Sequence, residues 1–381
     1  MPRLLHLVAV AVVLLGFGAL SGCSGPASHE TFTPPSIAPS ASATPRGVVP
    51  TGAPVDVVTG LASPWSILRT SKLTLVSERD SGAIERVTAS GGLATIGTVP
   101  GVVHDGEGGL LGLALLQSGV TRWLYAYETT ATDNRIVRMT LDDQLALGAP
   151  HVILQGLATA NHHDGGRIAF GPDGMLYATV GDAGDTSHSQ DLSSLNGKIL
   201  RMTPTGGVPH GNPFPGSLIW SYGHRNPQGL AWDASGQLYA AEFGQDTWDE
   251  FNKITAGSNY GWPIVEGIAH DPRFVDPLVQ WPTDDASPSG LAYIDGTFFL
   301  AGLGGQRLWV ITVDAAGAAT ATALYAGQYG RLRDVAAGPG SGSDASLWIL
   351  TDNTDGRGSP RPGDDRILQV ATVPTKMMAA G

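Results

Sequence analysis

Short apolar stretches separated by polar, glycine-rich turns recur along most of the chain. In each copy a small or polar residue opens an apolar strand, a Gly/Asp/Ser turn follows, and a second apolar strand rich in aromatic residues comes next. The copies begin at Ser63, Gly109, Gly166, Gln228, Ser289 and Arg333. Their spacing of roughly 45 to 60 residues leaves room for four strands in each unit, which is typical of a propeller blade. We therefore predict an all-β fold, a six-bladed β-propeller with four-stranded antiparallel blades.

The turns and the lack of helical patterns agree with this prediction. The chain has 52 glycines and 26 prolines, as expected for many tight turns, and long amphipathic helical windows are absent from the sequence. A pair of sandwiches or a jelly roll is the alternative, but neither explains the sixfold repetition. We expect the propeller to cover residues 51–373 and a C-terminal tail to cover residues 374–381.

The N-terminal segment has a different character. An apolar run from Leu4 to Leu20 is too short to span a bilayer comfortably and ends in Ser21-Gly22-Cys23, a small-residue pattern typical of a secretory cleavage site. Cys23 is the only cysteine, and lipid attachment explains it better than a disulfide or a catalytic role. The segment resembles a bacterial lipoprotein lipobox. An ordinary signal peptide with an incidental cysteine is the alternative.

These features predict where the protein resides. Residues 1–22 are expected to be a lipoprotein signal peptide, and residues 23–50, rich in Ser, Thr, Pro and Ala, a disordered tether behind the lipidated Cys23. The propeller would then lie outside the cytoplasm, held to the bacterial cell membrane through the lipid anchor only.

The charge of the chain limits the partners that it can have. With 15% charged residues and a net charge of −12, the protein is a poor candidate for binding nucleic acid. Only four of the 22 basic residues are lysines. Arginine is the residue expected where planar carboxylates are held in fixed geometry, although a general compositional bias explains the ratio equally well.

Polar side chains gather just ahead of the third, fourth and sixth copies. The segments are NHHDGGR (Asn161–Arg167), SYGHRNPQGLAW (Ser221–Trp232) and GRLRDV (Gly330–Val335), which supply His163; Arg225, Asn226 and Gln228; and Arg331 and Arg333. Loops of different blades converge on the axis at one end of a propeller. The equivalent positions of these segments therefore predict one shared pocket that combines a base with an anion-binding cluster.

These motifs resemble those of the soluble pyrroloquinoline quinone (PQQ)-dependent glucose/sorbosone dehydrogenase family, including its aldose sugar dehydrogenase branch. Two further segments match in the same order, DGEGGLLGLA from Asp105 and DEFN followed by GSNYGWP from Asp249. The resemblance covers roughly Val55 to Val370. It implies a quinoprotein that oxidises aldose sugars at C1 to lactones by hydride transfer to PQQ, with Ca²⁺ as a second cofactor, a small neutral sugar as substrate, and a cytochrome or quinone as electron acceptor.

The resemblance also implies roles for particular residues. His163 is the expected general base, because the family spacing of His, one residue, two small residues and Arg selects it over His162. Glu107 and His162 stand at substrate positions. PQQ is a flat quinone with three carboxylates and needs guanidinium groups and amide donors around it. The residues implied to contact PQQ are Arg225, Asn226, Gln228, Arg331 and Arg333.

The calcium positions follow from the same resemblance. Gly244 and Gln245 stand where the family has a Gly-Pro pair whose carbonyls face the calcium beside the cofactor, and Ca²⁺ accepts carbonyl ligands. A second ion would use the Glu250 carboxylate and the Tyr260 carbonyl. The alternative is that Asp249 and Glu250 are solvated turn acids.

Three departures from the family pattern leave other functions open. Gly304 stands where many relatives have a lysine near the cofactor, Glu107 where the glucose dehydrogenase has a glutamine, and His162 where it has an aspartate. The sugar preference is therefore not transferable. Gly304 favours a second hypothesis, a non-catalytic propeller lipoprotein that has lost PQQ and acts as an envelope binding module. A third, a calcium-dependent lactonase, would need a carboxylate-lined axial metal site and no arginine cluster.

Overall fold

The computed structural model describes residues 47–341 and 345–375, and in them the strands form six antiparallel sheets of four strands each. Blades 1 to 3 are β2 (Pro64–Arg69), β3 (Thr74–Glu78), β4 (Ala83–Val87) and β5 (Leu93–Thr98); β6 (Leu110–Ser118), β7 (Thr121–Thr129), β8 (Asn134–Thr140) and β9 (His151–Leu157); and β10 (Ile168–Phe170), β11 (Leu176–Val180), β12 (Lys198–Met202) and β13 (Ile219–Tyr222). Blades 4 to 6 are β14 (Asn226–Trp232), β15 (Leu238–Phe243), β16 (Trp248–Lys253) and β17 (Val279–Pro282); β18 (Pro288–Ile294), β19 (Thr297–Gly302), β20 (Arg307–Val313) and β21 (Ala319–Leu324); and β22 (Leu332–Ala337), β23 (Ser346–Thr351), β24 (Arg366–Pro374) and β1 (Val48–Thr59). The prediction of a six-bladed β-propeller is confirmed.

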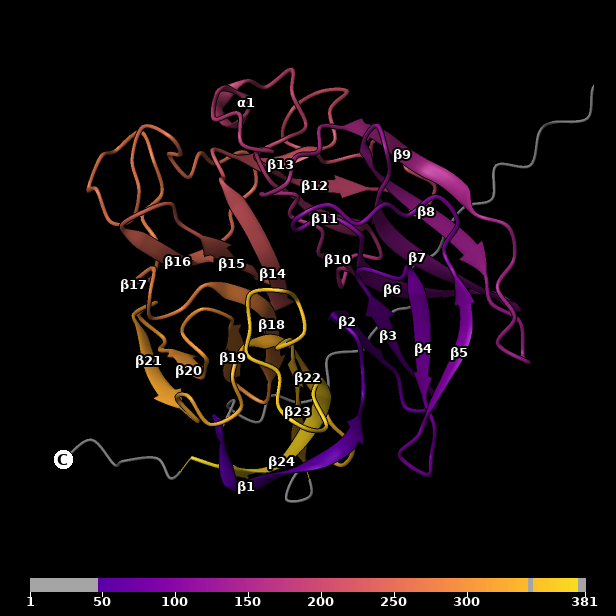
Figure 1. Cartoon of the computed structure of the whole chain (residues 1–381). Coiled ribbons are helices and arrows are strands. Elements are labelled where there is room, and N and C mark those ends of the chain that lie inside the picture. The colour runs from indigo at the N-terminus through magenta and orange to yellow at the C-terminus, as the bar shows by residue number, and fades with distance from the viewer. Residues whose placement is uncertain (1–46, 342–344, 376–381) are drawn as a thin grey trace, which may run out of the picture. The chain divides into compact units, whose positions relative to one another are not determined.

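The six sheets are arranged around a central channel, with β2, β6, β10, β14, β18 and β22 innermost (Figure 1). Neighbouring blades touch through these innermost strands except between blades 3 and 4, where β11 makes the contact to β14. The six repeat copies read from the sequence correspond to the first two strands of each blade. The aromatic second strands are therefore the ones packed just outside the channel.

The hydrophobic core is divided into layers between the blades. Six clusters of buried apolar side chains each join the facing surfaces of neighbouring sheets. Strands β11 and β19 are buried along their whole length, whereas the outermost strands β5 and β21 alternate between half-buried and exposed residues. Apolar runs in the inner strands and mixed outer strands follow from burial on both faces near the channel and solvent at the rim.

The ring is closed by the N-terminal strand. Strand β1 pairs antiparallel with β24, from Val48 opposite Pro374 to Thr59 opposite Arg366, so the two ends of the propeller share blade 6. Strand β1 begins at Val48, inside the segment predicted to be tether, and the folded domain therefore starts slightly earlier than expected. Hydrogen bonds between the ends of the chain hold the first and last elements of the ring together.

Each blade runs in the same direction, which gathers a defined set of loops at one end. The innermost strand of a blade starts at this end, where it follows the outermost strand of the previous blade, and the loop between the second and third strands returns to it. A short helix, α1 (Ser187–Gln190), lies in one such loop of blade 3. All three polar segments predicted from the sequence therefore lie at this end, which we call the upper end.

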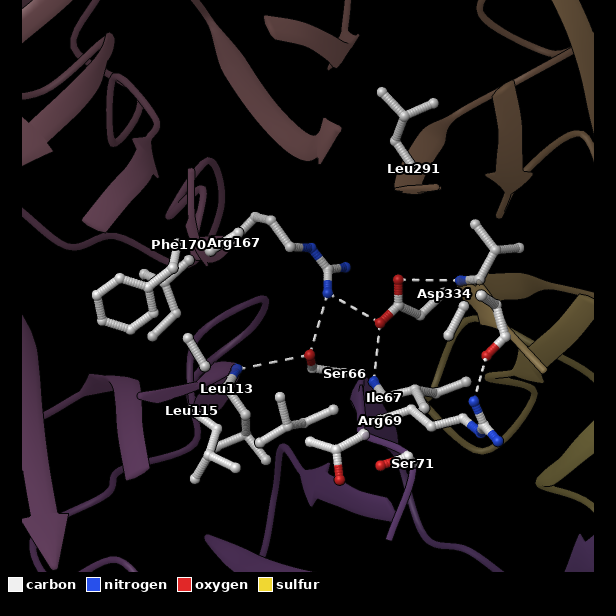
Figure 2. A pocket seen from close by; sticks show the side chains of 18 residues that line it. Ser66, Ile67, Arg69, Ser71, Leu113, Leu115, Arg167, Phe170, Leu291 and Asp334 are labelled. Atoms are coloured by element: carbon white, nitrogen blue, oxygen red, sulfur yellow. Dashed lines mark hydrogen bonds and ion pairs between the residues drawn. The ribbon is translucent and has the colours of Figure 1, made fainter. Parts of the chain in front are cut away.

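A buried ion pair crosses the channel below the upper end. Arg167 Nη1 lies 2.9 Å from Asp334 Oδ2 and 3.1 Å from Ser66 Oγ, and Arg167 Nε donates to the carbonyl of Gln228 at 2.9 Å. Asp334 in turn accepts hydrogen bonds from the backbone N–H groups of Ile67 and Val335. We call Arg167, Asp334 and Ser66 the plug, because they tie together the starts of β2, β10 and β22 (Figure 2), and the hydrogen bond from Arg167 to Gln228 adds the start of β14.

Below the plug the channel opens into a cavity of about 460 Å³, the lower cavity (Figure 2). Its walls are the later residues of the innermost strands, such as Leu68, Leu115 and Ala336, with Arg69 near its edge. The Arg69 guanidinium donates to the carbonyl of Ala337 at 3.0 Å and lies over the ring of Trp348. Among the charged residues of the lower cavity, Arg167 and Asp334 are thus paired with each other, and Arg69 is held by a carbonyl and an aromatic ring.

Several predictions concern residues outside the described ranges. Cys23, the signal peptide, most of the tether and the end of the predicted C-terminal tail belong to them. Within residues 47–341 and 345–375, no helix has the length and apolarity needed to cross a membrane.

Candidate active site

A second cavity of about 170 Å³, the upper cavity, lies above the plug. Loops and strand starts of blades 1, 2, 4, 5 and 6 form its wall. The lining residues are Trp65, Glu107, Gln228, Phe243, Ser287, Leu303, Arg331, Arg333 and Arg357. Trp65 is its floor toward the plug, since its ring faces the guanidinium of Arg333 at 5.8 Å and that of Arg167 at 4.3 Å.

Glu107 is placed beside His163 by a close approach of two loops. The Glu107 N–H donates to the carbonyl of Asn161 at 3.1 Å. Gly106 precedes it in the left-handed region, and a Cβ on this residue would lie 2.0 Å from the same carbonyl oxygen, so only glycine fits here. The Glu107 carboxylate then accepts a hydrogen bond from the His163 N–H at 3.0 Å.

His163 is held by a buried aspartate that the sequence analysis did not identify. Its Nδ1 lies 2.7 Å from Asp182 Oδ1, and Asp182 is fully buried. The other Asp182 oxygen accepts a hydrogen bond from Trp262 Nε1 at 2.8 Å. Because a carboxylate only accepts, Nδ1 carries the proton and Nε2 keeps its lone pair. Nε2 has no hydrogen-bond partner within the described residues.

The hydrogen-bond partners of Asp182 favour its ionised form. Burial raises the pKa of the Asp182 carboxyl, but the hydrogen bond and charge of His163, together with the donors of Gly184 and Trp262, outweigh burial and hold the pKa below its ordinary value. Asp182 therefore stays ionised and fixes the tautomer and the orientation of the His163 ring.

The backbone of His163 supports the same interpretation. It is in the left-handed region with φ of 63°, which is unusual for a residue with a side chain. The Glu107 carboxylate and the turn at Asp182 fix this conformation, because Ala183 N–H donates to the His163 carbonyl. Conformations of this kind concentrate at functional sites, where surrounding contacts over-determine them.

His162 lies next to His163 but makes no hydrogen bond to Asp182 among the described residues. Its side chain is exposed, its Nδ1 is paired with Asn161 Oδ1, and its ring meets the His163 ring edge to face at 4.2 Å. Burial, followed by the charge of His163, lowers the pKa of His162. The structure therefore sets it beside the candidate base and at the surface.

Asn226 and Gln228 are both buried but have different surroundings. Asn226 Oδ1 accepts the Gly165 N–H at 3.0 Å, and Asn226 Nδ2 lies 3.3 Å from Glu107 Oε2, so this side chain joins the loops of His163 and Glu107. Gln228 Oε1 accepts hydrogen bonds from Ser289 Oγ and from Arg333 Nη1. Gln228 lines the upper cavity, whereas Asn226 supports its edge.

Arg331 and Arg333 bring two cations to one wall of the upper cavity. Arg331 Nε and Nη2 both contact Asp355 Oδ2, at 3.0 and 2.8 Å, and Arg333 Nε donates to Asp352 Oδ2 at 2.7 Å. Both aspartates are buried in the loop between β23 and β24. The carboxylates fix the guanidinium groups and leave some of their N–H donors for a further anion.

Arg225 lies on the other side of Phe243, in a much smaller cavity of about 10 Å³. Its guanidinium faces the Trp262 ring at 5.6 Å and donates to the Phe243 carbonyl at 3.3 Å. Burial lowers the pKa of Arg225 from its ordinary value. Its buried Nε has no hydrogen-bond partner among the described residues. Phe243 lines both cavities, so Arg225 is adjacent to the upper cavity and not inside it.

The four predicted calcium residues are brought together only in part. Gly244, Glu250 and Tyr260 line the small cavity of Arg225, and the Gln245 N–H donates to Glu266 beside it. Glu250 already accepts the Gly267 N–H and the Asn252 side-chain amide. Burial, followed by the charge of Glu242, raises the pKa of Glu250 to about 8. It is therefore a buried acid and not a solvated one. Within the described ranges, no three His, Cys, Asp or Glu side chains form a metal-binding group.

The structure gives a local reason for the glycine at position 304. A Cβ on Gly304 would lie 2.4 Å from the hydroxyl of Ser287, which lines the upper cavity. A longer side chain would therefore require Ser287 to move. Arg307 does not replace the missing cation at this cavity, because it pairs with Asp285 and lies over the Trp309 ring.

Three further residues of the site were missed in the sequence. Asp182 orients His163, Trp65 forms the floor, and Arg357 pairs with Glu107 at the edge of the cavity. Asp182 lies two residues after the second strand of the third copy and Asp352 one residue after that of the sixth, and an acid close behind these strands was an available signal. Nothing in the sequence pattern distinguished Arg357 from the neighbouring Arg361.

The chemistry of the upper cavity fits a planar anion such as PQQ. Guanidinium donors of Arg331 and Arg333, the Gln228 amide and the flat Trp65 ring meet in one place, and the orphaned Nε of buried Arg225 lies close by. Because a carboxylate of the protein already holds each of these guanidinium groups in place, a carboxylate of the ligand binds to it without a large cost of side-chain reorganisation.

Comparisons with known proteins agree with the site. A PQQ-bound structure of aldose sugar dehydrogenase from Streptomyces coelicolor is 52% identical, with 86% of this chain and 98% of that chain covered and a TM-score of 0.81. The aldose sugar dehydrogenase YliI of Escherichia coli is 30% identical over 78% of this chain and 89% of its own length. The quinoprotein glucose dehydrogenase B of Acinetobacter calcoaceticus is 35% identical, but the alignment spans 51% of this chain and 49% of that protein.

The family model for glucose/sorbosone dehydrogenases matches residues 61–360, which is nearly the whole propeller. The relatives, the fold and the order of the motifs agree, and this chain belongs to the glucose/sorbosone dehydrogenase family.

Proposed function

We propose that this protein is a PQQ-dependent dehydrogenase that oxidises aldose sugars at C1. The observation that carries the proposal is the juxtaposition of a base with a free Nε2, the His163–Asp182 pair, and a cavity lined by fixed arginines. The similarity to a PQQ-bound aldose sugar dehydrogenase supports this choice of cofactor and substrate.

Arg331, Arg333 and Gln228 would hold PQQ, with Arg225 and Asn226 at the edge of its site. The guanidinium groups neutralise its carboxylates, and Asp352 and Asp355 keep them in place. When bound, PQQ supplies a quinone that accepts the hydride from C1, so an aldose leaves as its lactone.

His163 acts as the general base in this proposal. Its Nε2 takes the proton of the C1 hydroxyl, and the ionised Asp182 stabilises the positive charge that then develops on the ring. Glu107 fixes the backbone of His163 and offers a carboxylate to the sugar, with His162 at the outer edge of the substrate site.

Calcium is part of the proposal, because a cation near the quinone oxygens makes the quinone more electrophilic. Gly244 and Gln245 would contribute carbonyls, a hard oxygen set that suits Ca²⁺. Glu250 and Tyr260 would serve a second ion.

The remaining parts of the proposal rest on the sequence. A lipid on Cys23 would anchor the protein at the extracytoplasmic face of the bacterial cell membrane, with a cytochrome or quinone as electron acceptor. The non-catalytic propeller is the second candidate, supported by Gly304 and the absence of a substituting cation from Arg307. A calcium-dependent lactonase is not supported by a carboxylate-lined axial site among the described residues.

Titration of the full chain with PQQ and CaCl₂, followed by dye reduction with a panel of neutral aldoses, separates the two candidates. Saturable binding at micromolar PQQ with turnover that requires an aldose supports the dehydrogenase. Lack of PQQ binding, with a folded protein by circular dichroism, would contradict it and favour the binding module.

A further inference from the structure

Arg357 forms an ion pair with Glu107 at the edge of the upper cavity. Its Nη1 lies 3.3 Å from Glu107 Oε1, and the two residues are 250 positions apart in the sequence. The Glu107 side chain is 21% exposed and that of Arg357 is 45% exposed, while the His163 side chain is 11% exposed. The pair therefore extends outward from the base toward solvent.

The position of Arg357 is built into the fold. Asp355 Oδ1 accepts the backbone N–H groups of Arg357 and Gly358, at 2.9 and 3.0 Å, which forms a tight turn that presents the Arg357 side chain. The other oxygen of Asp355 holds Arg331. One buried carboxylate thus fixes both a proposed cofactor arginine and the outer arginine.

The hydrogen-bonding capacity of Glu107 is nearly filled. Its Oε2 is within reach of the His163 N–H and Asn226 Nδ2, and its Oε1 accepts from Arg357. A carboxylate oxygen has about two acceptor positions, so one position remains, on Oε1. Arg357 has donors left over, because its guanidinium makes a single hydrogen bond within the described residues, to Glu107.

An acceptor and a donor therefore lie side by side and face the cavity. Two adjacent hydroxyl groups of a sugar match this arrangement, since one donates to Glu107 Oε1 and the next accepts from Arg357. The pair carries no net charge, which suits a neutral substrate. Because Glu107 adjoins the base, the hydroxyl that it reaches is the one next to the oxidised carbon.

We propose that Arg357 is a specificity-determining residue that, with Glu107, recognises two adjacent hydroxyls of a neutral aldose beginning at C2. This inference rests on the proposed sugar dehydrogenase function. The recognised substrates are aldoses with hydroxyls at both C2 and C3. Aldoses that lack the C2 hydroxyl lose the contact to Glu107, and those that lack the C3 hydroxyl lose the contact to Arg357, so both are disfavoured.

The test compares kcat/KM for D-glucose and 3-deoxy-D-glucose, which lacks the hydroxyl assigned to Arg357, using the full chain loaded with PQQ and CaCl₂. In the wild type we expect glucose to be favoured by about tenfold or more, and in Arg357→Gln we expect this ratio to fall by about tenfold, mainly through the KM for glucose. Arg357→Lys keeps the charge without the planar fork and should give an intermediate ratio.

Arg361→Gln is the matched control, because Arg361 lies in the same loop, is exposed and contacts only backbone carbonyls and a neighbouring turn. Its ratio should match the wild type. PQQ titration of each variant, read by absorbance, should give the same affinity as the wild type.

Two results would overturn the inference. An unchanged sugar ratio in Arg357→Gln with normal PQQ affinity removes Arg357 from substrate recognition. An equal loss of turnover on both sugars makes it a support of the His163 loop only. If the wild type binds PQQ but oxidises no aldose, the proposed function fails as well, which the other two results do not imply.

Discussion

The two cavities of the central channel differ in size and in chemistry, and the smaller one carries the groups suited to binding and catalysis. The lower cavity is the larger, at about 460 Å³ against about 170 Å³, yet two of its three charged groups, Arg167 and Asp334, are paired with each other across the plug, and the third, Arg69, is held by a backbone carbonyl and an aromatic ring. The upper cavity has a glutamate, three arginines and, beside it, a histidine with an unused ring nitrogen. Volume alone would have selected the wrong end of the molecule.

The difference arises from which part of the blade lines each cavity. Regular innermost strands form the walls of the lower cavity, and their side chains and edges serve to hold the ring together. Loops between blades and the first residues of those strands form the upper cavity. Loops tolerate functional side chains because they contribute less to the core, and a rigid scaffold then fixes their positions. The chemistry is therefore at the upper end.

Replacing the candidate base should have the largest effect. His163→Ala removes the group that accepts the proton, and we expect kcat for aldoses to fall on the order of 10²–10⁴-fold. PQQ affinity should change little, because the arginines and not His163 carry the cofactor contacts. Steady-state dye reduction and PQQ titration measure the two effects separately.

His162→Ala sharpens this result, since the two rings are neighbours but only His163 is held by Asp182. We expect a loss of less than about tenfold from this exposed residue. A greater loss in His162→Ala than in His163→Ala would show that the base has been assigned to the wrong histidine.

The sequence predicted the blades but only part of the site. Repetition of apolar strands at a constant spacing identified the propeller, because each blade must bury the same faces. It did not show that β1 completes blade 6, since this strand precedes the first copy and pairs with a partner more than 300 residues away. Local patterns carry no information about such pairing.

The NHHDGGR segment shows the same limit within a single motif. Its histidine belongs to the upper end, but its arginine, Arg167, turns down the channel and forms the plug (Figure 2). Side chains a few residues apart at the entry to a strand can serve the site and the scaffold separately, and only the fold distinguishes them. Arg357 was missed for a related reason, because its partner Glu107 lies 250 positions away at the entry to another blade.

Breaking the plug should affect stability more than chemistry. Arg167→Met leaves Asp334 buried without its cation, and loss of one partner of a buried pair costs about 3–5 kcal/mol. We expect the free energy of unfolding, measured with urea, to fall by this amount. The turnover of the folded fraction should stay close to that of the wild type, because the plug lies below the upper cavity.

The double variant Arg167→Met, Asp334→Leu tests the reason for that loss. It removes both charges, so it should recover a large part of the stability lost by Arg167→Met. Arg69→Gln, at the edge of the lower cavity, should change the free energy of unfolding little. A double variant less stable than Arg167→Met would show that the plug acts through its hydrogen bonds to Ser66 and Gln228 and not through its charge.

The smallest expected effect concerns stability below about pH 5. There, acidification should change the contributions of Asp182 and Asp334 to the free energy of unfolding in opposite directions. The pKa of Asp182 lies below its ordinary value, so the unfolded chain binds more protons at this position and its contribution to stability is lost as the pH falls. Burial raises the pKa of Asp334, although Arg167 opposes this, so the folded protein binds more protons there and stability is lost as the pH rises.

Urea unfolding between pH 3 and pH 5 tests this difference. The free energy of unfolding of the wild type should exceed that of Asp182→Asn by less as the pH falls, with a change on the order of 1 kcal/mol. Its excess over that of the Arg167→Met, Asp334→Leu variant should grow on acidification. Parallel pH profiles for the two variants would mean that the carboxylates at the site and in the plug have the same electrostatic environment, and would remove the contrast between the two regions.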